Sequence, residues 1–245
     1  MRQGKFTIVM SASVPSGDDA QYARSQVQIE NAVIALARAV FHAGGTLVFG
    51  GHPSISPLVA MVATEFENDR DPYTSIIIYQ SLAYRDVIPR ETQFLFTLGF
   101  TEVRWIPAEE GEIFNPYTGI NCPRSLLAMR QRMMTEPKPH AMVCIGGKDV
   151  VRDGVRIRGV LDEFEIFKKE RPGQRIFLFK STGGTTEKIT QSVDETGARM
   201  SPSPITVIDK EYAPAPGSSE AAYLLNVPYA FLAGEIVRQV ILENV

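Results

Sequence analysis

The sequence predicts an α/β fold: a Rossmann-like, doubly wound, mostly parallel sheet. Short β-branched runs alternate with longer segments of helical periodicity along the chain, and this alternation favours right-handed crossovers between parallel strands. The strand-like runs are apolar almost throughout, as is typical of strands covered on both faces. Glycine pairs follow two of these runs, at the strand ends where such folds bind ligands.

The first half of the chain alternates regularly. A strand at 6–10 precedes a helix at 21–41, whose apolar residues recur every three or four positions. Gly44 and Gly45 end this helix, where a positive φ is favoured. The elements expected next are a strand at 46–49, a helix at 56–66, a strand at 75–79, a short helix within 91–100 and a strand at 103–106.

The second half continues in the same way. The elements expected there are a helix at 126–134, a strand at 141–145, a helix at 159–170, a strand at 175–179, a helix from Gly183, a Pro- and Ser-rich loop at 202–219 and a helix at 229–243. No repeat, long linker or low-complexity tract interrupts them, so we expect a single domain over 1–245. The apolar C-terminal segment 227–245 packs either on this domain or on a second subunit.

Composition excludes several classes of protein. Of 245 residues, 44% are hydrophobic and 22% charged, as in ordinary globular proteins. The net charge of −3 leaves no electrostatic footprint for a nucleic-acid polymer. No apolar run is long enough to span a membrane. Cys122 and Cys144 cannot build a disulfide framework, so we expect a cytoplasmic protein. Three scattered histidines predict no metal site, and no cofactor is expected.

Small and donor-rich residues follow the expected strands. The candidate ligand-binding residues are Ser11, Ala12 and Ser13; Gly50, Gly51, His52 and Ser54; Arg85; and Gly146, Gly147 and Lys148. Glycine lets backbone N–H groups approach an anion, and the helix N-terminus that follows favours negative charge. This composition predicts a phosphate or nucleotide site.

Each of these features also has a plainer interpretation. A glycine pair can be only a tight turn, His52 can cap its own turn, and Arg85 can lie in a solvated loop. The insert 148–158, with Arg152, Arg156 and Arg158, is either a basic lid or a solvated hairpin. Neither G-x-G-x-x-G nor the P-loop motif is present, which argues against ordinary dinucleotide dehydrogenases and NTPases.

Five sequence segments carry a family resemblance. They are Met10-Ser-Ala-Ser13, Leu47-Val-Phe-Gly-Gly51, Met129-Arg-Gln-Arg132, Val143-Cys-Ile-Gly-Gly147 and Gly159-Val-Leu-Asp-Glu163. Their order and spacing resemble those of the Lonely-guy and lysine-decarboxylase-like phosphoribohydrolases. These enzymes belong to the SLOG superfamily, which also contains non-enzymatic sensors. The last two segments look like a split form of the enzymes' Pro-Gly-Gly-x-Gly-Thr-x-x-Glu motif.

The departures from this motif favour the sensor branch. Eleven residues, 148–158, separate Gly147 from Gly159, Val160 stands in place of the motif's Thr, and Ile145 in place of its Pro. The chain is therefore closer to the sensor and antiphage-defence-associated members. Those members are similar to the ADP-ribose-binding region of some TRPM channels and to the signal-binding domain of Thoeris-type effectors.

The resemblance implies roles for three residues. Glu163 would be the carboxylate that stabilises an oxocarbenium-like state or activates water, and Arg132 would hold a phosphate or the departing base. Gly159 would contact the ligand. The plainer alternatives are a helix-start carboxylate for Glu163 and a surface ion pair for Arg132.

Two functions follow from the resemblance. The first is a sensor that binds a nucleotide or ADP-ribose-type ligand without turnover. The second is an N-glycosidic hydrolase, either nucleoside 5′-monophosphate phosphoribohydrolase-like or NAD-glycohydrolase-like. The implied partners are the small nucleotide ligand, a homodimer or higher homo-oligomer, and an effector chain for the sensor. Neither a nucleic-acid polymer nor a membrane is expected.

Overall fold

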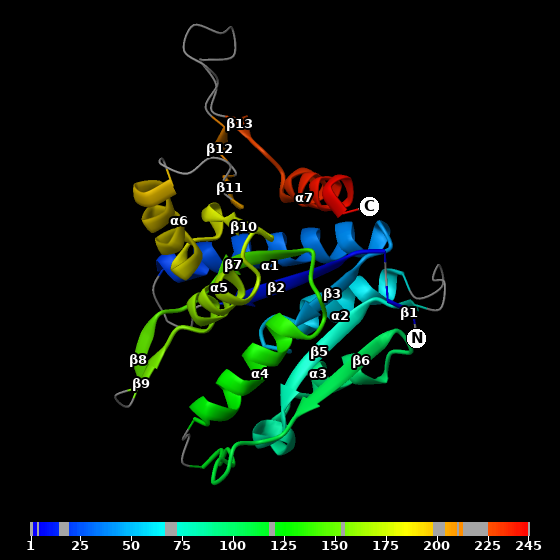
Figure 1. Cartoon of the computed structure of the whole chain (residues 1–245), viewed down its shortest axis with the longest axis vertical. Helices are drawn as coiled ribbons and strands as arrows, with labels where there is room; N and C mark the ends of the chain where they lie inside the picture. Colours follow the sequence, from blue (N-terminus) through cyan, green and yellow to red (C-terminus); the bar gives the residue numbers. More distant parts are fainter. Residues whose placement is uncertain are drawn as a thin grey trace, which may run out of the picture.

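The computed structural model describes residues 2–3, 5–14, 20–66, 73–117, 121–152, 155–197, 204–209, 211–212 and 225–244. Its main sheet contains β2 (Thr7–Ser13), β3 (Thr46–Phe49), β5 (Ile76–Ser81), β6 (Thr101–Ile106), β7 (Ala141–Gly146), β10 (Arg175–Phe179) and β11 (Ile205–Ile208). The order is β11-β10-β7-β2-β3-β5-β6, and every pair is parallel (Figure 1). The predicted doubly wound α/β fold is thus confirmed, with its change of strand order beside β2.

Helices cover both faces of this sheet. The first layer contains α1 (Ala20–His42), α2 (Ser56–Glu65), α3 (Arg90–Thr97) and α7 (Tyr229–Asn244). The second contains α4 (Pro123–Thr135), α5 (Gly159–Glu170) and α6 (Gly184–Gly197). Side chains of β2 alternate between the layers: Ile8 and Met10 pack in the first, and Val9 in the second. Parallel strands buried on both faces explain the continuous apolar runs in the sequence.

Short ladders lie outside the main sheet. They are β1 (Arg2–Gln3) with β4 (Tyr73–Thr74), β8 (Val150–Arg152) with β9 (Val155–Ile157), and β12 (Glu211–Tyr212) with β13 (Leu225–Asn226). The β8–β9 pair is the insert that interrupts the split motif. It is an antiparallel hairpin that projects from the body beside α5 (Figure 1).

The prediction of a loop over 202–219 is wrong for its first part. Residues Ile205 to Ile208 form β11, which extends the sheet in parallel beside β10. The carbonyl of Pro204 already accepts a hydrogen bond from the N–H of Ile176 at 2.9 Å. The β-branched run Ile-Thr-Val-Ile favours a strand, but the prolines and serines around it hid that signal. Residues 202–203, 210 and 213–219 of this segment lie outside the described residues.

The C-terminal helix packs within the chain. Tyr229, Ala233, Ile236, Val237 and Val240 are buried on one face of α7, and the helix lies beside α1 (Figure 1). Part of the apolar C-terminal segment is therefore covered by the chain itself, whereas Phe231 is 61% exposed and Leu242 70%. Over the described ranges, no helix has the length and hydropathy to span a membrane.

Candidate functional site

The turn after β7 carries one of the predicted glycine pairs. Gly146 and Gly147 have φ of +62° and +98°, in the region that favours glycine. A Cβ on Gly146 would lie 2.4 Å from Cδ1 of Ile29, and a Cβ on Gly147 would lie 2.8 Å from Cβ of Val160. Conformation and space both require glycine at these two positions.

The backbone amides of this turn are already engaged. The N–H of Gly146 donates to Oγ1 of Thr182 at 2.8 Å, and the N–H of Gly147 donates to the carbonyl of Ser13 at 2.9 Å. Neither amide is therefore free to receive an anion from a ligand. The glycine pair shapes the turn that carries Lys148, and direct ligand contacts fall to side chains around it.

The start of α6 forms two hydrogen bonds to the carbonyls of this turn. Oγ1 of Thr186 donates to the carbonyl of Gly146 at 2.8 Å, and the N–H of Thr185 donates to the carbonyl of Gly147 at 3.1 Å. A Cβ on Gly184 would lie 2.3 Å from that second carbonyl oxygen. The sequence of this Gly-Gly-Thr-Thr segment predicts a helix start but gives no sign of its contact with the β7 turn.

Glu163 lies near the start of α5, over the C-terminal end of β2. Oγ of Ser11 donates to its Oε2 at 2.5 Å, and its side chain is 14% exposed. Burial raises the pKa of Glu163, and this effect outweighs the opposing influence of Arg130 and Ser11. Cys144 is the register neighbour of Ser11 on β7. Burial and the nearby Glu163 raise the pKa of the Cys144 thiol.

The arginine that reaches Glu163 is Arg130, two residues before the predicted Arg132. Nε of Arg130 lies 3.4 Å from Oε1 of Glu163, and its Nη1 lies 3.4 Å from Oδ2 of Asp162. This Nε is buried and has no hydrogen-bond partner within the described part of the chain. Arg132 is 62% exposed and pairs with Glu136 on its own helix. Residues two apart on a helix point about 200° apart, so only one of them can face α5.

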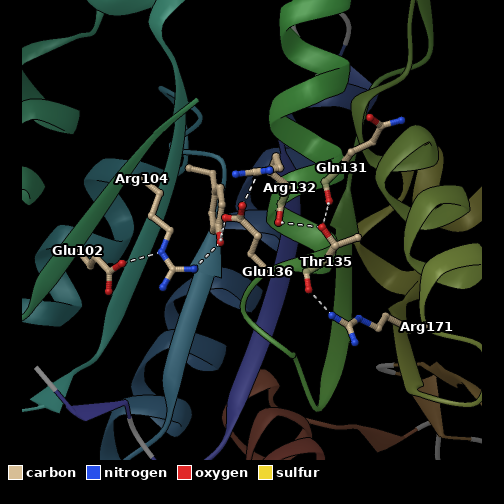
Figure 2. A network of polar contacts seen from close by, with 8 residues as sticks. Glu102, Arg104, Gln131, Arg132, Thr135, Glu136 and Arg171 are labelled. Carbon is tan, nitrogen blue, oxygen red and sulfur yellow. Dashed lines mark hydrogen bonds and ion pairs between the residues drawn. The ribbon is translucent and has the colours of Figure 1, made fainter. Parts of the chain in front are cut away.

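Arg132 belongs to a separate polar network below the C-terminal end of α4 (Figure 2). Arg104 donates to Oε1 of Glu102 and to the hydroxyl of Tyr79, both at 2.6 Å. That hydroxyl donates to Oε2 of Glu136 at 3.1 Å. Burial raises the pKa of Tyr79 to about 12. The network ties α4 to β5 and β6, and thereby fixes the rotation of α4 that turns Arg130 toward α5.

Tyr79→Phe tests this network. The Tyr79 side chain is fully buried. Deleting its hydroxyl removes one hydrogen-bond partner each from Arg104 and Glu136, whose side chains are 24% and 29% exposed. We expect a loss of about 1–2 kcal/mol of unfolding free energy, measured by chemical denaturation. Arg132→Met removes an exposed pair in the same network and should cost less than about 1 kcal/mol. Equal stability of Tyr79→Phe and the parent would contradict a stabilising role for the network.

His52 lies at the end of β3, in the same crevice. Its Nδ1 accepts a hydrogen bond from the N–H of Ser54 at 3.3 Å and lies 2.8 Å from that residue's Oγ. Burial, with smaller effects from Lys148 and Arg130, lowers the pKa of His52 to about 4. The imidazole is therefore neutral at pH 7. Because Nδ1 accepts, the proton is on Nε2 and is available to a ligand acceptor.

Two other predicted residues, Gly51 and Arg85, follow the strands β3 and β5. Gly51 has φ of +60°, and Nε2 of Gln80 lies 2.0 Å from where its Cβ would be. This Nε2 donates to the carbonyls of Gly50 and Gly51 at 3.3 and 3.4 Å. Arg85 lies on the 3-10 helix η1 (Leu82–Val87) with an exposed side chain. No hydrogen bond or ion pair described for the structured residues joins Arg85 to Glu163 or His52.

A cavity lies away from these strand ends. It measures about 940 Å³ between α1 and α7, and Ile34, Val237 and Ile241 are among its mainly apolar lining residues. This groove does not contain the residues at the strand ends. Its lining includes Arg38 and Arg238, but each already pairs with a carboxylate, of Glu65 and Glu235 respectively, so we place the candidate site at the strand ends instead.

The strand ends thus assemble one polar cluster from five segments. Its members are Ser11 of β2, His52 and Ser54 after β3, Arg130 of α4, Lys148 after β7, and Asp162 and Glu163 of α5. Two fixed cations, a neutral imidazole N–H and a carboxylate suit a ligand that carries both an anionic group and hydroxyl groups. Among the described residues, no group of three or more His, Cys, Asp or Glu could hold a metal ion.

The helical period of α4 could have identified Arg130 from the sequence. Met129 and Met133 are buried against the sheet, as the helical period predicts. Leu126 and Arg130 are four residues apart on the adjoining flank, and Leu126 also packs in the layer of α5. The family motif directed attention to Arg132, although the helical period places Arg130 next to the buried face.

Comparison with known proteins gives one family. Residues 21–202, well over half of the chain, match the sequence model described as the SLOG cluster3 family. A search of curated proteins finds no significant match. The structural-genomics target TM1055 is 16% identical with a TM-score of 0.47, over 83% of this chain and 91% of that one. DNA processing protein A from Streptococcus pneumoniae is 12% identical with a TM-score of 0.43, over 76% of this chain and 56% of that one.

Proposed function

Because the chain belongs to the SLOG cluster3 family, we propose that it binds a nucleotide or ADP-ribose-type ligand at the C-terminal ends of β2, β3 and β7. The observation that carries this proposal is the meeting of Glu163, Arg130, His52 and Lys148 beside these strand ends. Ligands of open α/β sheets bind at this edge, where the strand order changes. As a sensor, the protein would pass the bound signal to an effector chain.

Arg130 is the residue best placed to hold a phosphate. Its contacts with Asp162 and Glu163 are long, at 3.4 Å each, and its buried Nε has no hydrogen-bond partner among the described residues. A buried donor without a partner costs free energy. A phosphate oxygen would satisfy this donor with a charge-assisted bond, and Lys148 would add a second cation nearby.

Glu163 and His52 suit the sugar part of the same ligand. Glu163 is held by Ser11 with its second oxygen toward Arg130, and carboxylates are strong acceptors for ribose hydroxyls. The neutral His52 supplies a donor without adding charge. A cation–carboxylate–imidazole arrangement therefore matches a phosphorylated ribose better than a simple anion.

Hydrolysis of an N-glycosidic bond is the second candidate, and the raised pKa of Glu163 favours it. Burial raises the pKa of Glu163, which is the direction expected for a carboxyl that acts as a general acid. The enclosure of this side chain by Ser11 and Arg130 argues for binding instead. Binding without turnover is therefore our first proposal.

The test uses a panel of nucleoside monophosphates, NAD and ADP-ribose, read by thermal shift and by mass spectrometry. Arg130→Met should weaken binding of the ligand found by at least about tenfold, as expected for a lost charge-assisted bond. Arg132→Met is the matched control, on the same helix but in the network of Figure 2, and should bind as the parent does. A ligand affinity that is insensitive to Arg130→Met, or equally reduced by both variants, would contradict the proposed site.

The same panel separates the two functions. A ligand that raises the melting temperature and is recovered intact makes the protein a binding module. A free base in the mass spectrum makes it an N-glycosidic hydrolase and names the substrate. If no member of the panel shifts the melting temperature or changes in mass, the nucleotide proposal fails.

A further inference from the structure

The β6 edge of the main sheet has unpaired backbone groups. β6 pairs only with β5 among the described strands and ends the strand order, so its other side faces outward (Figure 1). The N–H of Ile76 donates to the carbonyl of Phe100, and Ile76 is the register partner of Thr101. In a parallel ladder this means that Glu102 and Arg104 bond to β5, while Val103 and Trp105 direct both backbone groups outward. The carbonyl of Thr101 also points outward, but its N–H donates to the carbonyl of Leu98 at 3.0 Å.

The outward-facing residues have strand-forming side chains. Thr101, Val103 and Trp105 are β-branched or aromatic. Trp105 is 36% exposed and packs edge-on against Phe96 of α3. The edge carries no proline or bulge, which are devices that proteins use to block strand addition. A six-residue open edge of this kind is a template for another strand.

We propose that two copies of the chain associate through antiparallel pairing of their β6 strands, with Val103 on the two-fold axis. In this register Val103 lies opposite its own copy, and Thr101 lies opposite Trp105 of the other copy. Val103 and its copy then exchange both backbone hydrogen bonds, and the N–H of Trp105 donates to the carbonyl of Thr101 in the other copy. The N–H of Thr101 keeps its bond to Leu98. The pairing joins the two sheets into one continuous sheet.

Charge selects this register. Glu102 and Arg104 point to the same face of the sheet, where Arg104 bonds to Glu102 at 2.6 Å. With Val103 on the axis, Glu102 of each copy faces Arg104 of the other in a non-hydrogen-bonded pair, where Cβ atoms are about 4.5–5.5 Å apart. A slip by two residues in one direction places Glu102 opposite Glu102, and in the other direction Arg104 opposite Arg104. Both slipped registers are repulsive.

The exposure of the Glu102 and Arg104 side chains supports an interface held partly by the ion pair between them across the axis. The side chain of Glu102 is 41% exposed and that of Arg104 24%, so both can reach a partner without leaving β6. The surface that one strand can bury is small, and we expect a dissociation constant in the micromolar range. The pairing also explains why a tryptophan stands on an exposed edge.

The test measures mass by sedimentation equilibrium over a wide concentration range. The parent should be dimeric at the highest concentrations of this range. Val103→Pro removes an outward N–H and leaves the ladder to β5 intact, and Glu102→Lys places like charges opposite Arg104. Both variants should weaken the dimer at least tenfold while circular dichroism stays unchanged. Val103→Thr, which keeps the N–H, and Glu170→Lys, which changes an exposed charge on α5, are the matched controls and should remain dimeric.

A mixing experiment tests the register itself. Glu102→Lys and Arg104→Glu should each weaken self-association, because each places like charges across the axis. Mixed together they should form a heterodimer, because both cross-axis pairs then carry opposite charges. A monomeric parent at every concentration, or a dimer that survives Val103→Pro and Glu102→Lys in folded protein, would overturn the proposal. If Arg104→Glu fails to fold through its contact with Tyr79, Val103→Pro still decides the outcome.

Discussion

Gly147→Val is expected to destabilise the fold by about 3 kcal/mol or more. The φ of +98° is strained for any β-branched residue. The new Cβ would also lie 2.8 Å from Cβ of Val160 and 3.0 Å from Cβ of Thr185. For a chain of this size, such a loss lowers the melting temperature by about 6–12 °C. Differential scanning calorimetry measures it directly.

Gly173→Val is the matched control for this effect. Gly173 has φ of +92°, and a Cβ there would meet nothing within 4 Å. It therefore carries the conformational cost without the steric cost, and the difference between the two variants measures the packing of the β7 turn. Equal melting temperatures would show that the turn relaxes and that Gly147 is not sterically required. From the sequence alone, Gly147→Val would be expected to weaken ligand binding by blocking the approach of the ligand to the backbone.

Glu163→Gln is expected to abolish any N-glycosidic turnover, by at least about 100-fold, and to keep ligand binding within a few-fold. Glutamine retains the shape of the side chain and an acceptor for Ser11, but not the charge or the proton. Glu165→Gln, on the same helix with an exposed side chain, is the control and should behave as the parent. Equal hydrolysis by Glu163→Gln and the parent would remove Glu163 from the chemistry.

The same pair of variants gives a pH dependence with a defined sign. Because burial raises the pKa of Glu163 in the folded protein, the folded state holds this proton more tightly than the unfolded chain does. The stabilisation that this proton provides is complete below the pKa that Glu163 has in the unfolded chain. It is lost as pH rises through the higher pKa that Glu163 has in the folded protein. Glu163→Gln has no such proton, so its melting temperature should rise relative to the parent as pH increases above about 4. A difference that is constant with pH would contradict the raised pKa.

Local patterns in the sequence predicted most of the elements correctly. The strands at 46–49 and 175–179 and the helix at 159–170 coincide with β3, β10 and α5. The fold class and membership of the SLOG superfamily are also confirmed. Each of these conclusions depends on residues close together in the chain: apolar runs, helical periods and the glycines that end them.

The edge strand β11 marks the limit of such patterns. Its four residues favour a strand in themselves, but their neighbours are typical of loops. What makes them a strand is the unpaired side of β10, which lies about thirty residues earlier in the chain. Backbone pairing is decided between strands, so a short strand is stabilised by a partner that local sequence does not reveal.

The sequence by itself determined the order of the elements and the edge of the sheet at which small and charged residues gather. The tertiary structure decided which of those residues meet. It placed Arg130 rather than Arg132 beside Glu163, because the rotation of α4 is set by packing and by the Tyr79 network. It also engaged the amides of Gly146 and Gly147 with Thr182 and Ser13. Helical and strand periods are local, whereas these contacts join residues far apart in the chain, and only packing selects them.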